Sequence, residues 1–369
     1  MALLEDLRAR TPAMVDALRV LVEAESPTAD ADACRACADV ADALAAELLG
    51  RRAERVQAGG RVHLRWRFGA PTRVLLVGHL DTVWPVGTLA RWPFEVRDGH
   101  ATGPGVFDMK AGVVQLFFAL AALDSLDGVA VLLTTDEETG SATARPLLED
   151  TAPGVEAALV LEPSAHGSLK TERKGVAHYE LEVTGRAAHA GLDPEKGANA
   201  AVELAHQLLA VAALARPEAG TTVTPTTVRA GTVANAVPAE ASAFVDVRVR
   251  TLAESERIAF ALAGLRPVTP GTSVTVSCIV EVPPLERRAS AGLFARARRV
   301  AEEVGLPPLT DASVGGGSDG NTLAALGLAV LDGLGAVGDR AHAEGEYVEV
   351  GALADRAALV AALVQDLLA

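Results

Sequence analysis

Apolar residues are distributed along the chain in a way that predicts buried strands alternating with helices. Short continuous apolar runs, each bounded by turn-forming residues, occur at 73–78, 129–135, 157–162 and 328–333. A helical pattern at about 110–123 lies between the first two runs. Strands of a parallel sheet are covered on both faces and therefore read as continuous apolar runs. The pattern predicts an α/β domain with a mostly parallel central sheet.

The pattern changes between residues 171 and 283, where apolar and polar residues alternate along the strands. Alternation with a period of two is typical of strands that bury only one face. The predicted order is strand, helix, strand, strand, helix, strand, which is the β-α-β-β-α-β arrangement of a ferredoxin-like domain. We therefore expect an α+β domain over 171–283, inserted between the two parts of the α/β domain, 1–170 and 284–369. Its six elements are expected at 176–185, 197–215, 221–234, 239–250, 252–265 and 272–282.

Composition narrows the class of partner. The formal net charge of -15 argues against nucleic acid or an anionic membrane surface. Residues 1–26 carry acids within an apolar pattern, which predicts an amphipathic helix and not a signal peptide. The nearly apolar run at 111–123 is too short to span a bilayer. Three cysteines cannot form a disulfide framework, so a cytoplasmic protein is expected, with Cys34 and Cys37 as packing residues of a helix and not a redox or zinc pair.

Ionisable side chains follow three of the predicted strands. In an open α/β sheet, ligands bind beyond the carboxyl ends of the strands, so these side chains can converge. Carboxylates gathered there would repel one another strongly unless cations neutralised them. Imidazole and carboxylate ligands suit zinc, with manganese or cobalt as weaker possibilities, and a bridging carboxylate can hold two ions about 3.5–4 Å apart. The side chains are His79 and Asp81 after the first strand, Asp136, Glu137 and Glu138 after the second, and Glu162 after the third.

A further acid, Asp108, follows a Gly-Pro-Gly turn and precedes the helical pattern that starts near residue 110. It is free to face the same edge of the sheet as the other acids. In isolation it is better explained as a helix cap. The metal interpretation rests on the whole set of acids and not on any one of them.

Two short spacings in the sequence suggest separate roles for neighbouring side chains. His79 and Asp81 lie on the same side of an extended segment, so the Asp81 carboxylate is expected to accept a hydrogen bond from the second ring nitrogen of His79. The adjacent Glu137 and Glu138 allow one carboxylate to bind metal while the other takes a proton from bound water. Spacing alone does not say which of the two does which.

With these motifs the sequence resembles the M20 metallopeptidases, a group that includes glutamate carboxypeptidase, acetylornithine deacetylase, succinyl-diaminopimelate desuccinylase and aminoacylases. The resemblance covers nearly the whole chain and is nearest to the glutamate carboxypeptidase branch. It implies a zinc-peptidase-like catalytic domain with an inserted lid or dimerisation domain. The motifs that carry it are GHLDTVWP (78–85), GPGVFDMKAG (103–112), TDEETGS (135–141), LEPS (161–164), GRAAHAG (185–191), AGTVANAVPAEASAFVDVRVR (230–250), GGGSDG (315–320) and AHAEGEYV (341–348).

The resemblance assigns roles at the metal centre. It implies two zinc ions per subunit, with cobalt or manganese as possible replacements. Asp81 would orient a metal-bound histidine, and Glu137 would be the general base. The metal ligands that it implies are His79 and Glu162 for one ion, Glu138 and His342 for the other, and Asp108 as the bridge.

The resemblance also implies substrate contacts. His189 would help to stabilise the oxyanion, often from the partner subunit of a homodimer, against the alternative of an ordinary turn residue. Asn235 and Arg248 would hold the substrate carboxylate, although Arg248 could be a solvated strand residue. The glycine-rich turn with Gly316 and Gly317 could offer backbone N–H groups to the same anion. Lys170 could meet a side-chain carboxylate of the substrate, although a solvent-exposed lysine is the more common outcome.

The resulting hypothesis is zinc-dependent hydrolysis of an N-acyl amino acid or short peptide, releasing the C-terminal amino acid. An alternative within the same chemistry is a deacylase such as acetylornithine deacetylase or succinyl-diaminopimelate desuccinylase. A remote alternative is a binding relative that keeps the fold without catalysis. The intact Glu137 and the intact set of ligands argue against the last of these.

Overall fold

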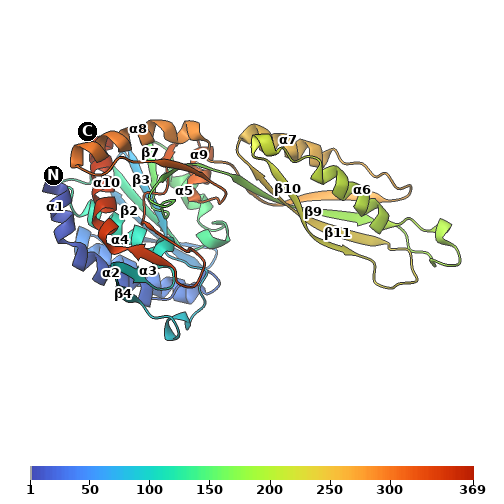
Figure 1. Cartoon of the computed structure of the whole chain (residues 1–369), viewed down its shortest axis with the longest axis horizontal. Helices are drawn as coiled ribbons and strands as arrows, with labels where there is room; N and C mark the ends of the chain where they lie inside the picture. The colour runs from blue at the N-terminus through green and yellow to red at the C-terminus, as the bar shows by residue number, and fades with distance from the viewer. Residues whose placement is uncertain (1) are drawn as a thin grey trace. The chain divides into compact units, whose positions relative to one another are not determined.

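A computed structural model describes residues 2–369, which divide into two units (Figure 1). Met1 lies outside the described residues. Unit 1 comprises 2–172, 286–314 and 318–369, and unit 2 comprises Arg173–Leu285 together with Gly315–Gly317. Each unit has its own sheet and its own buried apolar cluster.

The central sheet of unit 1 has the order β1-β2-β6-β3-β7-β14. The strands β6, β3, β7 and β14 are mutually parallel, whereas β1 and β2 add an antiparallel edge. The predicted α/β class with a mostly parallel sheet is therefore confirmed, and the antiparallel edge is an addition to it. The strands are β1 (Glu54–Ala58), β2 (Arg61–Phe68), β3 (Val74–His79), β6 (Val129–Thr134), β7 (Ala157–Val160) and β14 (Ala329–Leu331).

Helices cover this sheet on both sides, as Figure 1 shows for α4 and α10 on one side and α5 and α9 on the other. On the first side α4 and α10 contact β3, while α3 packs on β2 and α8 on β14. On the second side α9 packs on β7 and β14 and contacts α5. The helices of unit 1 are α1 (Ala2–Ala9), α2 (Thr11–Glu23), α3 (Ala31–Leu49), α4 (Ala111–Leu120), α5 (Arg145–Thr151), α8 (Arg287–Val304), α9 (Asp319–Ala325) and α10 (Val350–Leu368).

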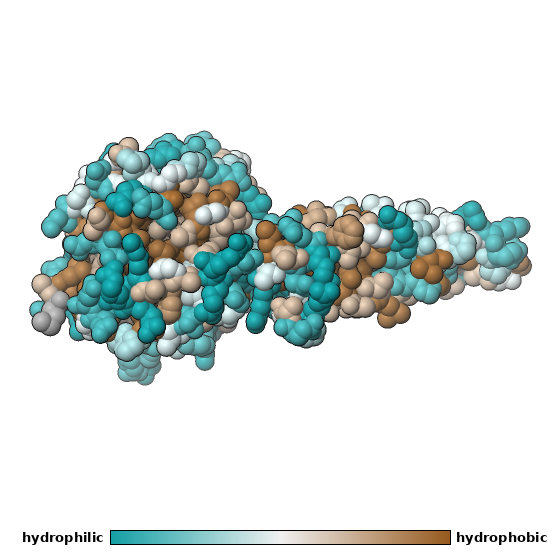
Figure 2. Space-filling view, turned by 90° about the horizontal axis from the view of Figure 1, so that it is seen from above, coloured by the Kyte–Doolittle hydropathy of each residue, from teal (hydrophilic) through white to brown (hydrophobic). Residues whose placement is uncertain are grey.

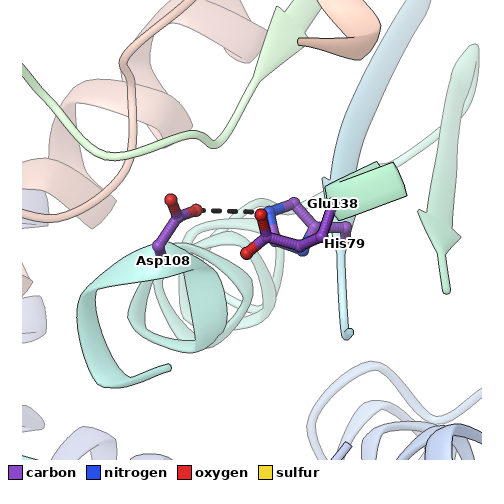
Figure 3. Close-up of side chains that lie close together, drawn as sticks. All are labelled: His79, Asp108 and Glu138. Carbon is purple, nitrogen blue, oxygen red and sulfur yellow. Dashed lines mark hydrogen bonds and ion pairs between the residues drawn. The ribbon is translucent and has the colours of Figure 1, made fainter. Parts of the chain in front are cut away.

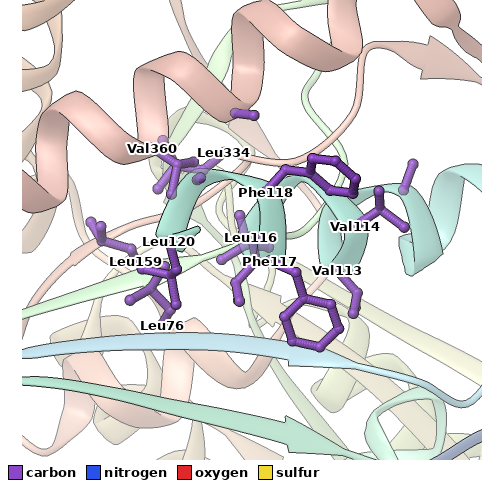
Figure 4. Packing of buried hydrophobic residues seen from close by; sticks show 14 of the residues in the cluster. Leu76, Val113, Val114, Leu116, Phe117, Phe118, Leu120, Leu159, Leu334 and Val360 are labelled. Carbon is purple, nitrogen blue, oxygen red and sulfur yellow. The ribbon is translucent and has the colours of Figure 1, made fainter. Parts of the chain in front are cut away.

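The core of unit 1 centres on α4, every residue of which is buried. Its sequence is apolar around the whole circumference because it lies between the sheet and α10. In Figure 4, Leu76 and Leu159 lie on the sheet side of α4, and Val360 lies on the side of α10. This packing fixes the start of α4, and therefore the loop that carries Asp108, against the strand ends.

The segment expected as one amphipathic helix over residues 1–26 is two helices, α1 and α2. Pro12 stands in the first turn of α2. Proline lacks the N–H that a continuous helix would need there, so the chain starts a new helix. Cys34 and Cys37 are buried free thiols on α3. Within 2–369, no helix has both the length and the apolar character that crossing a bilayer requires.

Unit 2 has a four-stranded antiparallel sheet in the order β10-β11-β9-β12 with two helices, which is the ferredoxin-like arrangement that the sequence predicts. Along β9, Tyr179 and Leu181 are buried, while the alternate residues His178 and Glu180 are partly exposed. The alternation buries one face of the sheet under the helices. The elements are β9 (Gly175–Thr184), α6 (Ala200–Ala212), β10 (Thr222–Ala230), β11 (Glu240–Val249), α7 (Leu252–Ala263) and β12 (Ser273–Val282).

A buried carboxylate ties the loop after α7 to α6. Glu203 accepts hydrogen bonds from the backbone N–H groups of Val268 (3.0 Å) and Thr269 (2.6 Å) and from the Gln207 side chain (2.6 Å). Burial would raise its pKa, but these hydrogen bonds lower the pKa of Glu203 to about 2. Glu203 is therefore a charged structural residue of unit 2.

Smaller sheets complete the chain. One has the order β15-β16-β5-β4, and another pairs β13 with β8. On the face shown in Figure 2, hydrophobic residues are scattered among hydrophilic ones. The most exposed large hydrophobic side chains, Phe260, Leu192 and Leu209, belong to unit 2. The remaining strands are β4 (Glu95–Arg97), β5 (His100–Thr102), β8 (Leu169–Arg173), β13 (Asp311–Val314), β15 (Gly338–Asp339) and β16 (Tyr347–Glu349).

Candidate metal centre

The candidate site lies at the carboxyl ends of three neighbouring parallel strands. His79 is the last residue of β3, Glu137 and Glu138 form a short helical turn after β6, and Glu162 follows β7. Because β6, β3 and β7 are adjacent in the sheet, these side chains reach one place. These side chains therefore converge at this edge, as the order of the strands predicts.

Asp108 lies between two histidines. Its Oδ1 is 3.2 Å from His79 Nε2, and its Oδ2 is 3.3 Å from His342 Nε2. Asp108 belongs to the irregular turn Val106–Lys110, and because Lys110 holds the N-cap position of α4, Asp108 is not the cap of that helix. Figure 3 shows its carboxylate facing His79, with Glu138 beside them. Each oxygen of Asp108 thus faces a different imidazole.

The remaining ligand candidates surround this pair. Glu138 lies 3.0 Å from His342 Nε2, and Glu162 lies 3.6 Å from His79 Nε2. His342 adopts a left-handed backbone conformation (φ 61°) in the loop between β15 and β16. One ligand atom each from His79, Asp108 and Glu138 lies within 4.8 Å of the others, an arrangement that could hold a metal ion. The donors are imidazole nitrogens and carboxylate oxygens, which fit zinc.

The hydrogen bond of the second ring nitrogen of His79 differs from the expectation. His79 Nδ1 lies 2.9 Å from the main-chain oxygen of Asp81 and 3.6 Å from its carboxylate Oδ1. The carboxylate of Asp81 accepts instead from the Thr28 hydroxyl (2.8 Å) and from the N–H groups of Glu137 (3.3 Å) and Glu138 (3.2 Å). Asp81 is fully buried. It therefore anchors the glutamate turn as well as contacting His79.

Glu137 is electrostatically distinct from its neighbour. Burial, followed by the nearby Glu162 carboxylate, raises the pKa of Glu137 well above its ordinary value. Asp319 contributes to the same effect, and burial raises its own pKa to about 6. Asp319 accepts hydrogen bonds from the hydroxyls of Ser141 and Thr134. A raised pKa is what a carboxyl group needs in order to take up and return a proton near neutrality.

The histidine contacts have the opposite effect on Asp108. Burial opposes ionisation, but the hydrogen bonds from His342 and His79 lower the pKa of Asp108 well below its usual range. Hydrogen bonds to Asp108 and Glu138 raise the pKa of His342 to about 10. Positive charge is therefore strongly favoured between these carboxylates, as a cation site requires.

Two buried polar residues in the same loops escaped the sequence argument. Glu346 is fully buried and accepts hydrogen bonds from the N–H groups of Phe107 (2.7 Å) and Asp108 (2.9 Å), and burial raises its pKa to about 7. Lys110 is buried and donates to the carbonyl oxygens of Leu21 (2.9 Å) and Ala24 (2.8 Å). Both lie inside quoted motifs, but only the fold supplies their partners.

Lys170 is not the solvent-exposed lysine that its residue type favours. Its side chain is 12% exposed, and its Nζ lies 4.0 Å from Glu162 Oε2. A cation at that distance lowers the free energy of the ionised carboxylate. Lys170 is thus beside the candidate metal ligands within unit 1.

The predicted substrate residues of the inserted domain lie in unit 2. His189 is exposed and forms an isolated antiparallel bridge with Ala236, and its neighbour Ala190 donates its N–H to the Asn235 carbonyl oxygen (2.9 Å). The structure thus brings the turns of His189 and Asn235 together. Arg248 lies on β11, where its guanidinium contacts both carboxylate oxygens of Asp246 at 3.0–3.2 Å. Its charge is already paired with that carboxylate.

The glycine-rich turn has an arginine partner that the sequence did not reveal. Arg173 is buried, and its Nη1 donates to the carbonyl oxygens of Gly316 (3.2 Å) and Gly317 (3.0 Å). The hydrogen bonds to these carbonyls attach the turn to Arg173, and both belong to unit 2. The expected binding of an anion by its N–H groups stays a prediction.

Comparison with known proteins identifies the family. The model of peptidase family M20/M25/M40 matches residues 75–366. The chain belongs to this family. Carboxypeptidase G2 of Pseudomonas sp. (strain RS-16) is 31% identical to it over 96% of this chain and 89% of that protein. Succinyl-diaminopimelate desuccinylase of Wolinella succinogenes is 31% identical over 76% of this chain and 80% of that protein.

Solved structures of the M20 family and its neighbours share the fold. Aminopeptidase PepT from Bacillus cereus superposes with a TM-score of 0.75 at 22% identity and covers 97% of this chain, with 99% of that chain matched. An M20 family metallo-carboxypeptidase from Sulfolobus solfataricus gives a TM-score of 0.69 at 16% identity, over 96% of this chain and 98% of that one. This chain is thus an M20 family hydrolase with a group of side chains that could hold a metal ion.

Proposed function

We propose that this M20 hydrolase is a dinuclear zinc enzyme that cleaves an amide bond and releases the C-terminal amino acid of an N-acyl amino acid or short peptide. The observation that carries the proposal is the placement of Asp108, whose two oxygens lie 3.2 Å and 3.3 Å from two different histidines. A carboxylate that faces two imidazoles in this way suits a bridge between two ions. Cobalt or manganese could replace zinc, because the same donor atoms serve them.

In the proposed arrangement, the ligands divide along the contacts of Asp108. When bound, the two ions would polarise the scissile carbonyl and make a water molecule nucleophilic at neutral pH. His79 and Glu162, whose Nε2 and Oε1 atoms are 3.6 Å apart, would hold one ion. Glu138 and His342, whose Oε2 and Nε2 atoms are 3.0 Å apart, would hold the other ion.

Glu137 would take the proton of the attacking water and return it to the departing amine. It adjoins His79 and Glu162 closely enough for ligand atoms of all three to lie within 4.8 Å of one another. Burial and the nearby Glu162 carboxylate raise its pKa, which is the direction that favours both uptake and return of a proton. Asp81, which holds the N–H of Glu137 and contacts His79, would fix the relative position of base and ligand.

Substrate recognition would involve unit 2 and the glycine-rich turn. His189 would donate to the oxyanion, Asn235 and Arg248 would bind the substrate carboxylate, and the N–H groups of Gly316 and Gly317 would add to that anion site. We propose that His189 acts across a homodimer formed by the inserted domain. The three free cysteines are compatible with the further proposal of a cytoplasmic enzyme.

A second candidate is a deacylase of a biosynthetic intermediate. It is favoured by the 31% identity to succinyl-diaminopimelate desuccinylase over 76% of the chain and by the 34% identity to acetylornithine deacetylase of Proteus mirabilis over 40% of it. Lys170 beside Glu162 would serve either substrate class, because both present carboxylates.

Metal analysis and a substrate panel test the proposal. The zinc-loaded protein should contain about two equivalents of metal per chain. It should hydrolyse folate-like N-acyl glutamates faster than N-acetylornithine or N-succinyl-diaminopimelate. The reverse order would replace the carboxypeptidase by the deacylase. Fewer than one equivalent of metal with every amide left intact would instead favour a non-catalytic binding relative.

A further inference from the structure

Glu346 is a fully buried carboxylate surrounded by N–H donors. Its Oε1 accepts from the backbone N–H groups of Phe107 (2.7 Å) and Asp108 (2.9 Å). Its Oε2 accepts from the backbone N–H of Gly105 (3.1 Å) and from the indole N–H of Trp84 (2.9 Å). Each oxygen thus receives two hydrogen bonds, which fills the acceptor capacity of a carboxylate.

These contacts join three segments that are distant in sequence. Trp84 follows His79 and Asp81, the Gly105–Asp108 turn carries the proposed bridging carboxylate, and Glu346 lies in the loop that carries His342. One side chain therefore links the three segments that carry the proposed ligands at 79, 108 and 342, and its hydrogen bond to Asp108 is to the main chain and not to the carboxylate.

The turn depends on this carboxylate for its hydrogen bonds. The backbone of Asp108 is extended, with φ -112° and ψ 96°, so its N–H is not part of the ladder of α4. Buried backbone N–H groups without an acceptor are rare, because no hydrogen bond within the protein replaces the one that the group made to water. Without Glu346, the N–H groups of Gly105, Phe107 and Asp108 would lose the acceptor that now fixes them.

We infer that Glu346 is a positioning residue of the metal centre, which holds the main chain of Asp108 so that the two carboxylate oxygens of Asp108 stay aimed at His79 and His342. The inference rests on the proposed function, because it assumes that Asp108 bridges two ions. Outer-shell partners of this kind orient ligands and typically change metal affinity or activity by about 10- to 100-fold when they are replaced.

The substitution Glu346→Gln tests the inference with almost no change in volume. Glutamine offers only one acceptor oxygen, and its NH2 group would face two N–H donors. The matched control is Glu203→Gln in unit 2, another buried glutamate that accepts backbone N–H bonds, here from Val268 and Thr269. The same change is thus made at a carboxylate that contacts none of the proposed ligands.

Metal affinity is measured for both variants by competition between the protein and a chelator for Zn²⁺, and the Co²⁺ form is examined by its visible absorption spectrum. Glu346→Gln should weaken Zn²⁺ binding by about 10- to 100-fold, alter the Co²⁺ spectrum and lower kcat with little change in KM. Glu203→Gln should lower thermal stability while leaving Zn²⁺ affinity and the Co²⁺ spectrum as in the wild type. Zn²⁺ affinity and kcat of Glu346→Gln equal to those of Glu203→Gln would overturn the inference.

A milder variant covers the case in which Glu346→Gln does not fold. Trp84→Phe removes one of the N–H donors to Glu346 and keeps the carboxylate, so Zn²⁺ affinity should fall in the same direction but less. Wild-type affinity in Trp84→Phe would then count against the inference. The wild-type titration separates the two proposals: if the wild type binds fewer than two equivalents, the dinuclear proposal fails, and if it binds two while Glu346→Gln matches it, only the role of Glu346 fails.

Discussion

Replacing Glu137 by glutamine removes the proposed base while keeping the shape of the side chain. Glu137 is partly buried, its carboxyl lies beside Glu162 and His79, and partial burial together with the Glu162 carboxylate raises the pKa of that carboxyl. The amide of glutamine cannot accept and return a proton. General acid–base catalysis contributes about 10²- to 10⁴-fold, so kcat should fall by that factor, equivalent to about 2.7–5.4 kcal/mol of activation free energy. Because one group is proposed to serve both as base and as acid, we expect the larger end of this range.

The geometry contains a competing role for Glu137. Its carboxylate, His79 and Glu162 also form a group that could hold an ion. If Glu137 were a ligand, Glu137→Gln would lose metal as well as activity. The adjacent Glu138→Gln is the matched control, since Glu138 lies 3.0 Å from His342 and is proposed as a ligand. It should lose about one of two equivalents of zinc.

The assay combines steady-state hydrolysis of an N-acyl glutamate with metal analysis of the same zinc-loaded samples. Glu137→Gln should retain both equivalents of zinc and show a KM close to that of the wild type. A variant that keeps its zinc and at least a tenth of the wild-type kcat would refute the role as base. A variant that loses zinc in parallel with Glu138→Gln would make Glu137 a ligand.

Further outcomes concern metal, charge and packing. Chelation should abolish hydrolysis, and zinc at 100 times its Kd should restore it and stabilise the fold by about 2.7 kcal/mol, measured as a rise in Tm. Asp108→Asn should bind zinc more weakly at both positions, and one unchanged equivalent would rule out a bridge. Phe117→Ala removes a buried ring that packs edge to face on Trp66 with ring centroids 5.8 Å apart, so denaturant unfolding should show a loss of about 3–5 kcal/mol. Glu203 has a pKa of about 2 in the folded chain, below the ordinary value of 4.5, so its charge stabilises the fold above pH 4.5 and that contribution disappears as the pH falls toward 2. Glu203→Gln should therefore be less stable than the wild type by about 1.5–3 kcal/mol at pH 7, and the difference should shrink between pH 4.5 and pH 2; a difference independent of pH would contradict the assignment.

The elements that could be predicted from sequence are those whose own pattern of apolar and polar residues shows which faces are buried. The apolar runs of β3, β6 and β7 and the alternating pattern of β9 each follow from the faces that they bury. The strand β2 escaped because it contains His63 and Arg65, which are buried. Arg65 is paired with Glu54 and Asp150. The residues next to Arg65 in the sequence do not show that carboxylates from other parts of the chain will neutralise it.

The candidate site divides in the same way. His79, Glu138 and Glu162 follow strands and could be brought together from the order of the elements alone. His342 could not, because it lies in a loop whose path depends on a left-handed backbone conformation at that residue. Glu346 and Arg173 were missed because a buried charge surrounded by N–H or carbonyl groups looks, in sequence, like any surface residue.

Lys110 gives the helix α2 a part in the site that its position in the chain does not suggest. The Lys110 ammonium is buried, and its hydrogen bonds to the carbonyl oxygens of Leu21 and Ala24 meet the end of that helix, where carbonyls lack partners within the helix. Removing segment 2–24 would leave this charge without those acceptors, which should destabilise the fold by several kcal/mol. The loss would fall two residues from Asp108. A shortened chain that begins after α2 should therefore lose activity, because the end of α2 binds Lys110 and so supports the loop that carries Asp108.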